Sequence, residues 1–159
     1  MAEKDVQVGM RAPDFELAGD DGGVFHLDDE RRRSPLILLF YPSDYGIVCS
    51  FQMKTFLEMD GEIARKGYRV VGISRNSVQT HLLWKERLGI SFLLLADPDG
   101  EVCTMYAGLQ ESGLMKNMPR RAVFIVDREG IIRYAWVSHT EGMPPRFDEI
   151  RETIGSLEL

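Results

Sequence analysis

Residues 36–49, LILLFYPSDYGIVC, decide how the rest of the chain folds. The run from Leu36 to Tyr41 is apolar throughout and is bounded by Pro35 and Pro42, which is typical of a short strand buried on both faces. Proline cannot donate a hydrogen bond to a sheet, so the strand is expected to end there. The sequence therefore predicts a central strand followed by a tight turn.

An amphipathic helix is predicted directly after this strand. Apolar side chains recur at a spacing that places them on one helical face, at Cys49, Met53, Phe56, Leu57, Ile63 and Ala64. Gly67 is suited to end the helix. Cys49 is thus expected at the start of a helix, beyond the C-terminal end of a buried strand, which is where sites form in open α/β sheets.

The position of Cys49 indicates a reactive thiol. The first N–H groups of a helix are unpaired and carry partial positive charge. This environment favours the nucleophilic thiolate and lowers the pKa of a cysteine from about 8.5 to roughly 3.5–7.5. The alternative is a buried, inert cysteine that packs as a small hydrophobic residue, and position alone leaves both interpretations open.

The segment from Phe40 to Cys49 resembles the signature of the peroxiredoxins, F-[YF]-P-x-x-[FY]-[TS]-x-x-C, in the alkyl hydroperoxide reductase/thiol-specific antioxidant family. The spacing from Pro42 and the aromatic Tyr45 match, whereas Gly46 replaces the family's Thr or Ser. The resemblance implies that Cys49 is a peroxidatic cysteine, whose thiolate attacks a peroxide oxygen and becomes a sulfenic acid. It also implies that Pro42 shields this thiolate from water.

The same resemblance implies a positive charge at the site. The family uses an arginine that begins a late strand, in the pattern R-x-x-F-[IVL]-[IV]-D, and RAVFIVD at residues 121–127 selects Arg121 over Arg120. An arginine stays charged at any working pH and forms several hydrogen bonds at once. Without the resemblance, both arginines are expected at a solvent-exposed strand start.

Gly46 motivates a second hypothesis. In the family the hydroxyl at this position is taken to hydrogen-bond the peroxide, and such a bond contributes about 1.5–3 kcal/mol. Its absence predicts chemistry slowed by about one to two orders of magnitude. The alternative function is a redox sensor or binding protein that has kept the fold and lost efficient turnover. Gln52, where many relatives have Glu, is expected to affect pocket polarity or helix contacts more than the reaction.

Cys103 is the only other thiol in the sequence. Many members of the bacterioferritin-comigratory-protein (PrxQ) branch carry a resolving cysteine five residues after the peroxidatic one, where this chain has Lys54. We therefore expect a one-cysteine mechanism in which an external thiol, such as a thioredoxin-like protein or a low-molecular-weight thiol, is the reductant. Resolution by Cys103 is the less favoured alternative.

The rest of the chain predicts one α/β domain over residues 1–159. Helices that alternate with buried strands before a late hairpin indicate a mixed sheet with helices on both faces. The order resembles a thioredoxin-like fold with the N-terminal β-hairpin extension of the peroxiredoxins. Further strands are expected at 12–17, 24–27, 68–74, 90–95, 121–127 and 131–137, and further helices at 76–88, 101–107 and 147–156. In the helix at 76–88, Val78, Leu82 and Leu88 are expected to face inward and Trp84 to cover the adjacent core.

Composition argues against several classes of partner. The net charge is −6 and no basic block offsets it, which argues against a nucleic-acid partner; the cluster at residues 30–33 is expected to be a solvated loop. No apolar run approaches the roughly 20 residues that span a bilayer, and residues 1–6 lack the apolar core of a signal peptide. Two widely spaced cysteines make no disulfide framework, so a cytoplasmic location is expected.

No metal or other cofactor is predicted. Histidines and cysteines stand at unrelated spacings and no phosphate-binding glycine motif is present. The sequence CSFQ at residues 49–52 lacks the second thiol of a thioredoxin-type C-x-x-C motif. The oligomeric state stays open between monomer and homodimer. A cysteine-dependent hydrolase is the last alternative; its base would be one of His26, His81 and His139.

Overall fold

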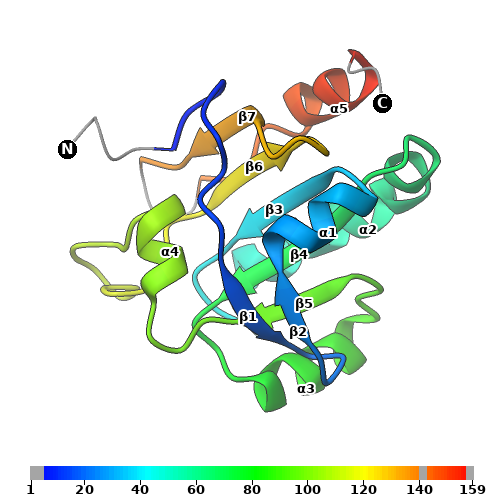
Figure 1. Cartoon of the computed structure of the whole chain (residues 1–159). Helices are drawn as coiled ribbons and strands as arrows, with labels where there is room; N and C mark the ends of the chain where they lie inside the picture. The colour runs from blue at the N-terminus through cyan, green and yellow to red at the C-terminus, as the bar shows by residue number, and fades with distance from the viewer. Residues whose placement is uncertain (1–5, 140–142, 157–159) are drawn as a thin grey trace.

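The computed structural model describes residues 6–139 and 143–156, in which strands and helices alternate (Figure 1). The strands are β1 (Glu16–Gly19), β2 (Val24–His26), β3 (Leu36–Phe40), β4 (Arg69–Ser74), β5 (Leu93–Ala96), β6 (Ala122–Val126) and β7 (Ile132–Val137). The helices are α1 (Leu27–Arg33), α2 (Ile47–Arg65), α3 (Val78–Leu88), α4 (Glu101–Tyr106) and α5 (Phe147–Ser156). Within these residues no helix is both long and apolar enough to cross a bilayer.

The strands form one mixed sheet in the order β2-β1-β5-β4-β3-β6-β7. The central strands β3, β4 and β5 run parallel, whereas β6 and β7 extend the sheet beyond β3 in antiparallel fashion. The β1–β2 hairpin joins the other edge through antiparallel pairing of β1 with β5. The mixed sheet and the N-terminal hairpin are therefore confirmed, although β1 begins at Glu16 rather than at residue 12.

Helices cover both faces of the sheet, and each face has its own apolar core (Figure 1). Helices α2, α3 and α5 pack on one side, called here the α2 face, and α1 and α4 pack on the other, called the α4 face. Because successive strand side chains alternate, β3 contributes Ile37 and Leu39 to the α2 face and Leu36, Leu38 and Phe40 to the α4 face. This strand is buried on both sides, as predicted.

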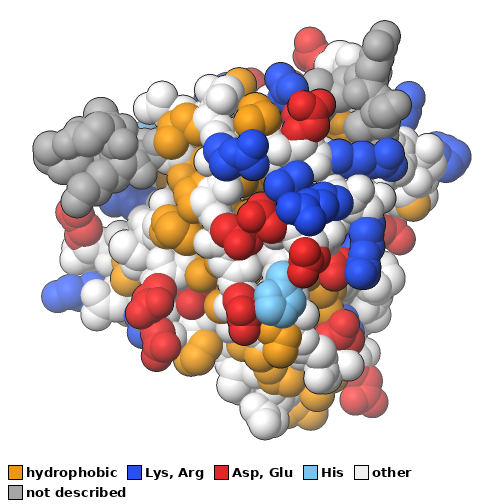
Figure 2. Space-filling model, viewed as in Figure 1, with side chains coloured by type: hydrophobic (Ala, Val, Ile, Leu, Met, Phe, Trp, Pro, Cys, Tyr) orange, Lys and Arg blue, Asp and Glu red, His pale blue; other side chains and the backbone are white. Residues whose placement is uncertain are grey.

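The charged segment after β2 is helix α1, so the prediction of a solvated loop at residues 30–33 is wrong. Acidic side chains occupy its first turn and basic side chains its last turn, an order that complements the helix dipole. Arg31 is buried, pairs with Asp28 at 3.3 Å and donates to the carbonyl oxygen of Arg128 at 2.6 Å. Figure 2 shows the resulting mixture of acidic and basic side chains on the face that carries α1.

Helix α3 turns a different side to the sheet from the one predicted. Its buried residues are His81 and Trp84, so the placement of Trp84 over the core is confirmed, whereas Leu82 is exposed and its inward placement is wrong. The indole of Trp84 packs against the ring of Tyr41, with their centroids 5.4 Å apart. A large aromatic ring gains more from burial than a leucine does, which favours this orientation of the helix.

Candidate active site

Cys49 lies where the chain passes from β3 into α2. Tyr41 and Pro42 are buried directly after the strand, and α2 begins at Ile47, so Cys49 is its third residue. The backbone of Tyr45 has a φ of 68°, in the left-handed region, and this turn leads the chain into the helix. The structure therefore has the predicted thiol in the first turn of a helix at the C-terminal end of a central strand.

Arg121 contacts this thiol. Its Nη2 atom donates to Cys49 Sγ at 3.5 Å, and both side chains are buried, with exposed fractions of 4% and 0%. The two residues are 72 positions apart, but β6 pairs with β3 so that Ala122 lies opposite Phe40. The guanidinium therefore comes from the neighbouring strand at the same sheet edge. Arg120 lies instead over Gly108.

Burial raises the pKa of the Cys49 thiol above its usual value. The pKa is lowered by a backbone hydrogen bond from Ser43 and by the charge and hydrogen bond of Arg121. The carboxylate of Asp44 raises the pKa further. The prediction of a lowered pKa is wrong for this conformation, because the loss of water around the sulfur outweighs the positive groups beside it. Formation of the thiolate therefore depends on Ser43 and Arg121.

Gly46 is the N-cap residue of α2, and no side chain caps the helix. A Cβ atom at this position would lie 3.4 Å from Cys49 Sγ and 3.4 Å from the carbonyl oxygen of Ser43, which are ordinary contact distances. The backbone there is extended, with a φ of −64° and a ψ of 143°, which any residue can adopt. A Cβ atom, the first side-chain atom of the Ser or Thr that the resemblance leads one to expect, therefore fits beside the sulfur.

Two buried polar side chains beside the thiol are incompletely paired. Gln52 lies one helical turn after Cys49 and is 2% exposed, and neither polar atom of its amide has a hydrogen-bond partner among the described residues. Arg121 Nε is buried and equally unpartnered within that part of the chain. Buried polar groups are almost always hydrogen-bonded in folded proteins, so such atoms indicate a place for water or a small polar molecule.

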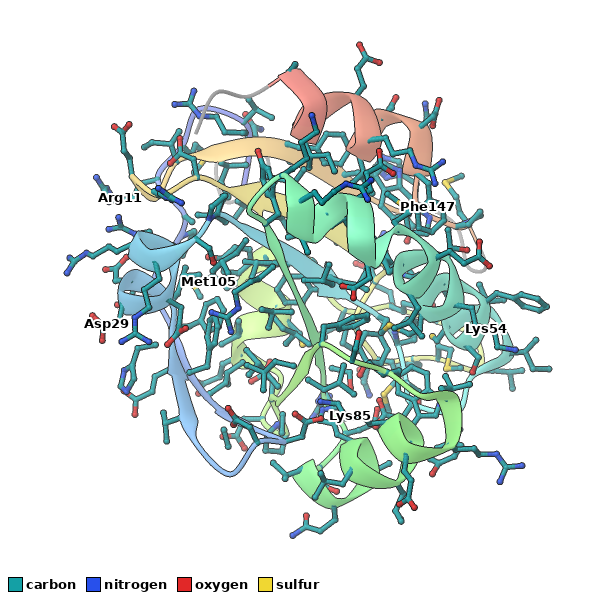
Figure 3. All side chains as sticks on the ribbon, turned by 90° about the vertical axis from the view of Figure 1, so that its right-hand side faces the viewer. Arg11, Asp29, Lys54, Lys85, Met105 and Phe147 are labelled. Atoms are coloured by element: carbon teal, nitrogen blue, oxygen red, sulfur yellow. The ribbon has the colours of Figure 1, made fainter. Side chains whose placement is uncertain are left out.

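Cys103 is far from this arrangement. It is buried from α4 in the core of the α4 face, whereas Cys49 belongs to the core of the α2 face, so the sheet separates the two free thiols. Lys54, which stands where many PrxQ members carry a second cysteine, is exposed on the outer side of α2 (Figure 3). The structure therefore has no second thiol beside Cys49.

The histidines do not form a base for Cys49. His81 is buried and its Nδ1 lies 2.7 Å from Asp44 Oδ2, whereas His26 and His139 are exposed. None of them is hydrogen-bonded to Cys49 in the part of the chain that the structure describes, so the arrangement of a cysteine hydrolase is not formed. Among residues 6–139 and 143–156, no group of three or more His, Cys, Asp or Glu side chains is placed to hold a metal ion.

The mixed sheet and the cysteine at a helix start define a thioredoxin-like protein with a thiol site at the C-terminal end of its central strand. The chain belongs to the AhpC/TSA family, whose sequence model matches residues 8–135. A Coxiella burnetii protein with the assigned name peroxiredoxin bcp is 33% identical over 134 residues, which cover 82% of this chain and 88% of that protein.

Two further comparisons agree with this family. A chloroplastic 2-cysteine peroxiredoxin of Chattonella marina var. antiqua is 31% identical over 144 residues, covering 84% of this chain and 72% of its own. The crystal structure of the peroxidoxin BcpB from Mycobacterium tuberculosis has the same fold, with a TM-score of 0.84 at 24% identity, and the match covers 97% of this chain and 99% of that one. The predicted thioredoxin-like fold and the resemblance to bcp-type peroxiredoxins are confirmed.

Proposed function

We propose that the protein is a thiol-dependent peroxidase in which Cys49 reduces hydrogen peroxide or an alkyl hydroperoxide. Membership of the AhpC/TSA family supports this function. The observation that carries it is the contact between the Arg121 guanidinium and the buried sulfur of Cys49. A fixed positive charge in a water-excluded site stabilises negative charge far better than it does in water, which is what attack on a peroxide requires.

The proposed chemistry is a displacement at oxygen. The Cys49 thiolate attacks one peroxide oxygen, an S–O bond forms as the O–O bond breaks, and the sulfur becomes a sulfenic acid. The second oxygen leaves as hydroxide or alkoxide and takes up a proton from water. Arg121 balances the charge on sulfur before the step and on the leaving oxygen during it, and the amide of Gln52 is available to a polar substrate.

Access to the sulfur requires local movement. Cys49 has an exposed fraction of 0%, so a peroxide reaches it only when neighbouring groups are displaced. This requirement favours small peroxides over bulky ones.

The second half of the cycle is proposed to use an external thiol. The thiol of a thioredoxin-like protein or of a small molecule attacks the sulfenic sulfur, water leaves and a mixed disulfide forms; a further thiol then releases Cys49. The separation of Cys49 from Cys103 by the sheet supports this route. Two free cysteines also support a reducing location such as the cytoplasm. Monomer and homodimer both suit the mechanism, because every residue invoked comes from one chain.

Treatment of the reduced protein with one equivalent of hydrogen peroxide is expected to oxidise Cys49 alone. Because no thiol lies beside it, the sulfenic acid persists long enough to be trapped with dimedone. Peptide mass spectrometry then finds the adduct on Cys49 and an unmodified Cys103. A disulfide between the two cysteines would contradict the one-cysteine route.

Gly46→Ser is expected to increase the rate of Cys49 oxidation by about tenfold to a hundredfold, because it supplies a hydroxyl donor for a bond of about 1.5–3 kcal/mol. The new side chain also caps α2, which adds a few tenths of a kcal/mol to the free energy of unfolding. Gly61→Ser, an exposed position on the same helix, is the matched control and is expected to react as the wild type does. An unchanged rate in Gly46→Ser would show that the missing hydroxyl does not limit the reaction.

A redox sensor is the second candidate. The observation that favours it is the absence of a side-chain hydroxyl at Gly46, the N-cap of α2. Both functions predict oxidation of Cys49, but they differ in turnover. A peroxidase consumes many equivalents of peroxide in excess thiol, whereas a sensor stops after one. Counting the peroxide consumed per protein in the presence of dithiothreitol separates the two.

A further inference from the structure

Asp44 is the centre of a buried hydrogen-bonded network in the loop that precedes α2. Its Oδ1 accepts from the hydroxyl of Tyr41 at 2.7 Å, its Oδ2 lies 2.7 Å from Nδ1 of His81, and its backbone N–H donates to Oδ1 of Asn76 at 2.9 Å. The exposed fractions are 4% for Asp44 and 0% for both Tyr41 and His81. Tyr41 and His81 therefore hold the carboxylate, Asn76 holds the backbone of Asp44, and the carboxylate is shielded from water.

The geometry restricts where the protons of this network lie. Nε2 of His81 is 2.9 Å from the carbonyl oxygen of Leu95, which can only accept, so Nε2 carries a hydrogen. Nδ1 faces a carboxylate oxygen, so one proton occupies that contact whether it belongs to the ring or to the carboxyl group. The hydroxyl of Tyr41 keeps its own proton, because burial raises its pKa well above the usual value. Asp44 and His81 together are therefore electrically neutral.

The loop held by this network is the loop that contacts the thiol. Ser43, directly before Asp44, supplies the backbone hydrogen bond to the sulfur of Cys49, and Gly46, two residues after Asp44, is the N-cap of α2. Between them, Tyr45 has a left-handed backbone, which for a residue with a side chain persists only when its surroundings determine it. An uncompensated charge on Asp44 would act directly on the nearby thiol, because that carboxylate raises the pKa of Cys49.

Other charged groups near His81 are already paired elsewhere. Lys85, one turn further along α3, forms an ion pair with Asp20 at 2.7 Å. Asp97, which follows β5, accepts from the backbone N–H of Cys103 at 2.8 Å. Asp44 is the carboxylate hydrogen-bonded to His81, and the hydroxyl of Tyr41 donates to the same carboxylate, so Asp44 is the carboxylate that His81 balances.

We propose that Asp44 and His81 are positioning residues for the reaction of Cys49. His81 neutralises the buried carboxylate and keeps the loop at residues 43–46 against the thiol. The inference rests on the peroxidase function proposed above, but alkylation of Cys49 tests the pair without any peroxide.

The test compares His81→Asn, Asp44→Asn and the double variant with the wild type, all in a Cys103→Ser background. The rate of alkylation by iodoacetamide against pH gives the pKa of Cys49, and stopped-flow mixing with hydrogen peroxide gives its oxidation rate. His81→Asn leaves an unbalanced carboxylate, so the pKa of Cys49 is expected to rise by about one unit and oxidation at pH 7 to slow about tenfold. The double variant removes that carboxylate, so its pKa is expected to return toward the wild-type value.

Two further variants keep the test decisive. Tyr41→Phe removes one donor to Asp44 without changing a charge and serves where His81→Asn does not fold; it is expected to slow oxidation several-fold. His26→Asn alters an exposed histidine and is expected to match the wild type. Folded His81→Asn or Tyr41→Phe protein that melts at a lower temperature but keeps the wild-type pKa and oxidation rate of Cys49 would overturn the proposal. Slow oxidation of the wild type itself would instead contradict the peroxidase function.

Discussion

Cys49→Ser is expected to reduce peroxide consumption to the uncatalysed rate, the largest effect of any substitution in this protein. A serine hydroxyl ionises far less readily than a thiol and does not form the oxidised sulfur on which the cycle depends. Enzymes accelerate reactions by at least about a million-fold over the uncatalysed reference, so the loss is expected to reach the limit of detection. Consumption of hydrogen peroxide in the presence of dithiothreitol measures it.

Cys103→Ser is the matched control for this prediction. It makes the same chemical change in a cysteine that is equally buried, with an exposed fraction of 0% at both positions, but on the other face of the sheet. We expect it to keep at least half of the wild-type rate. Loss of activity in Cys103→Ser together with retention of activity in Cys49→Ser would show that Cys49 is not the reactive thiol.

Arg121→Gln is expected to slow the oxidation of Cys49 by about a hundredfold to a thousandfold, the usual cost of removing one preorganised donor from a site of developing charge. The pKa of Cys49 is also expected to rise, since Arg121 lowers it against the effect of burial. Below that pKa the thiolate fraction increases about tenfold per pH unit. The variant should therefore recover part of its rate at higher pH.

The pH profile of alkylation and the rate of oxidation measured on the same samples separate these two effects. Arg120→Gln, whose side chain lies over Gly108 and not at the sulfur, is the control and should resemble the wild type in both. If Arg121→Gln only shifted the pKa and reacted normally at high pH, the guanidinium would act on the thiolate alone and not on the leaving oxygen.

Much of the fold could be predicted because its signals are local. The apolar run that becomes β3 lies between two prolines, and the strand pair at residues 121–137 is joined by a short turn. Helix α1 was missed because its charged residues conceal an inner side formed by Leu27 and Arg31 alone. The outward side of Leu82 was missed because the orientation of α3 depends on the packing of Trp84 against Tyr41 and on the burial of His81, contacts between distant segments.

The site was predictable only in part for the same reason. The helix start at Cys49 follows from the local pattern, but Arg121 could be selected only through a family resemblance, since nothing in the spacing joins two residues that meet across β3 and β6. The raised pKa of Cys49 depends on complete burial, which a periodic pattern does not quantify. The contact between Asp44 and His81, 37 positions apart, has no signal in the sequence at all.

The oxidation rate of the reduced wild-type protein by hydrogen peroxide, measured beside free cysteine from pH 5 to 9, tests the central claim most directly. Burial works against the thiolate, so any advantage must come from Arg121 acting on the charge that develops on oxygen. We predict that Cys49 reacts faster than free cysteine at every pH, and that the advantage disappears in Arg121→Gln. A rate equal to or below that of free cysteine across this range would contradict the account.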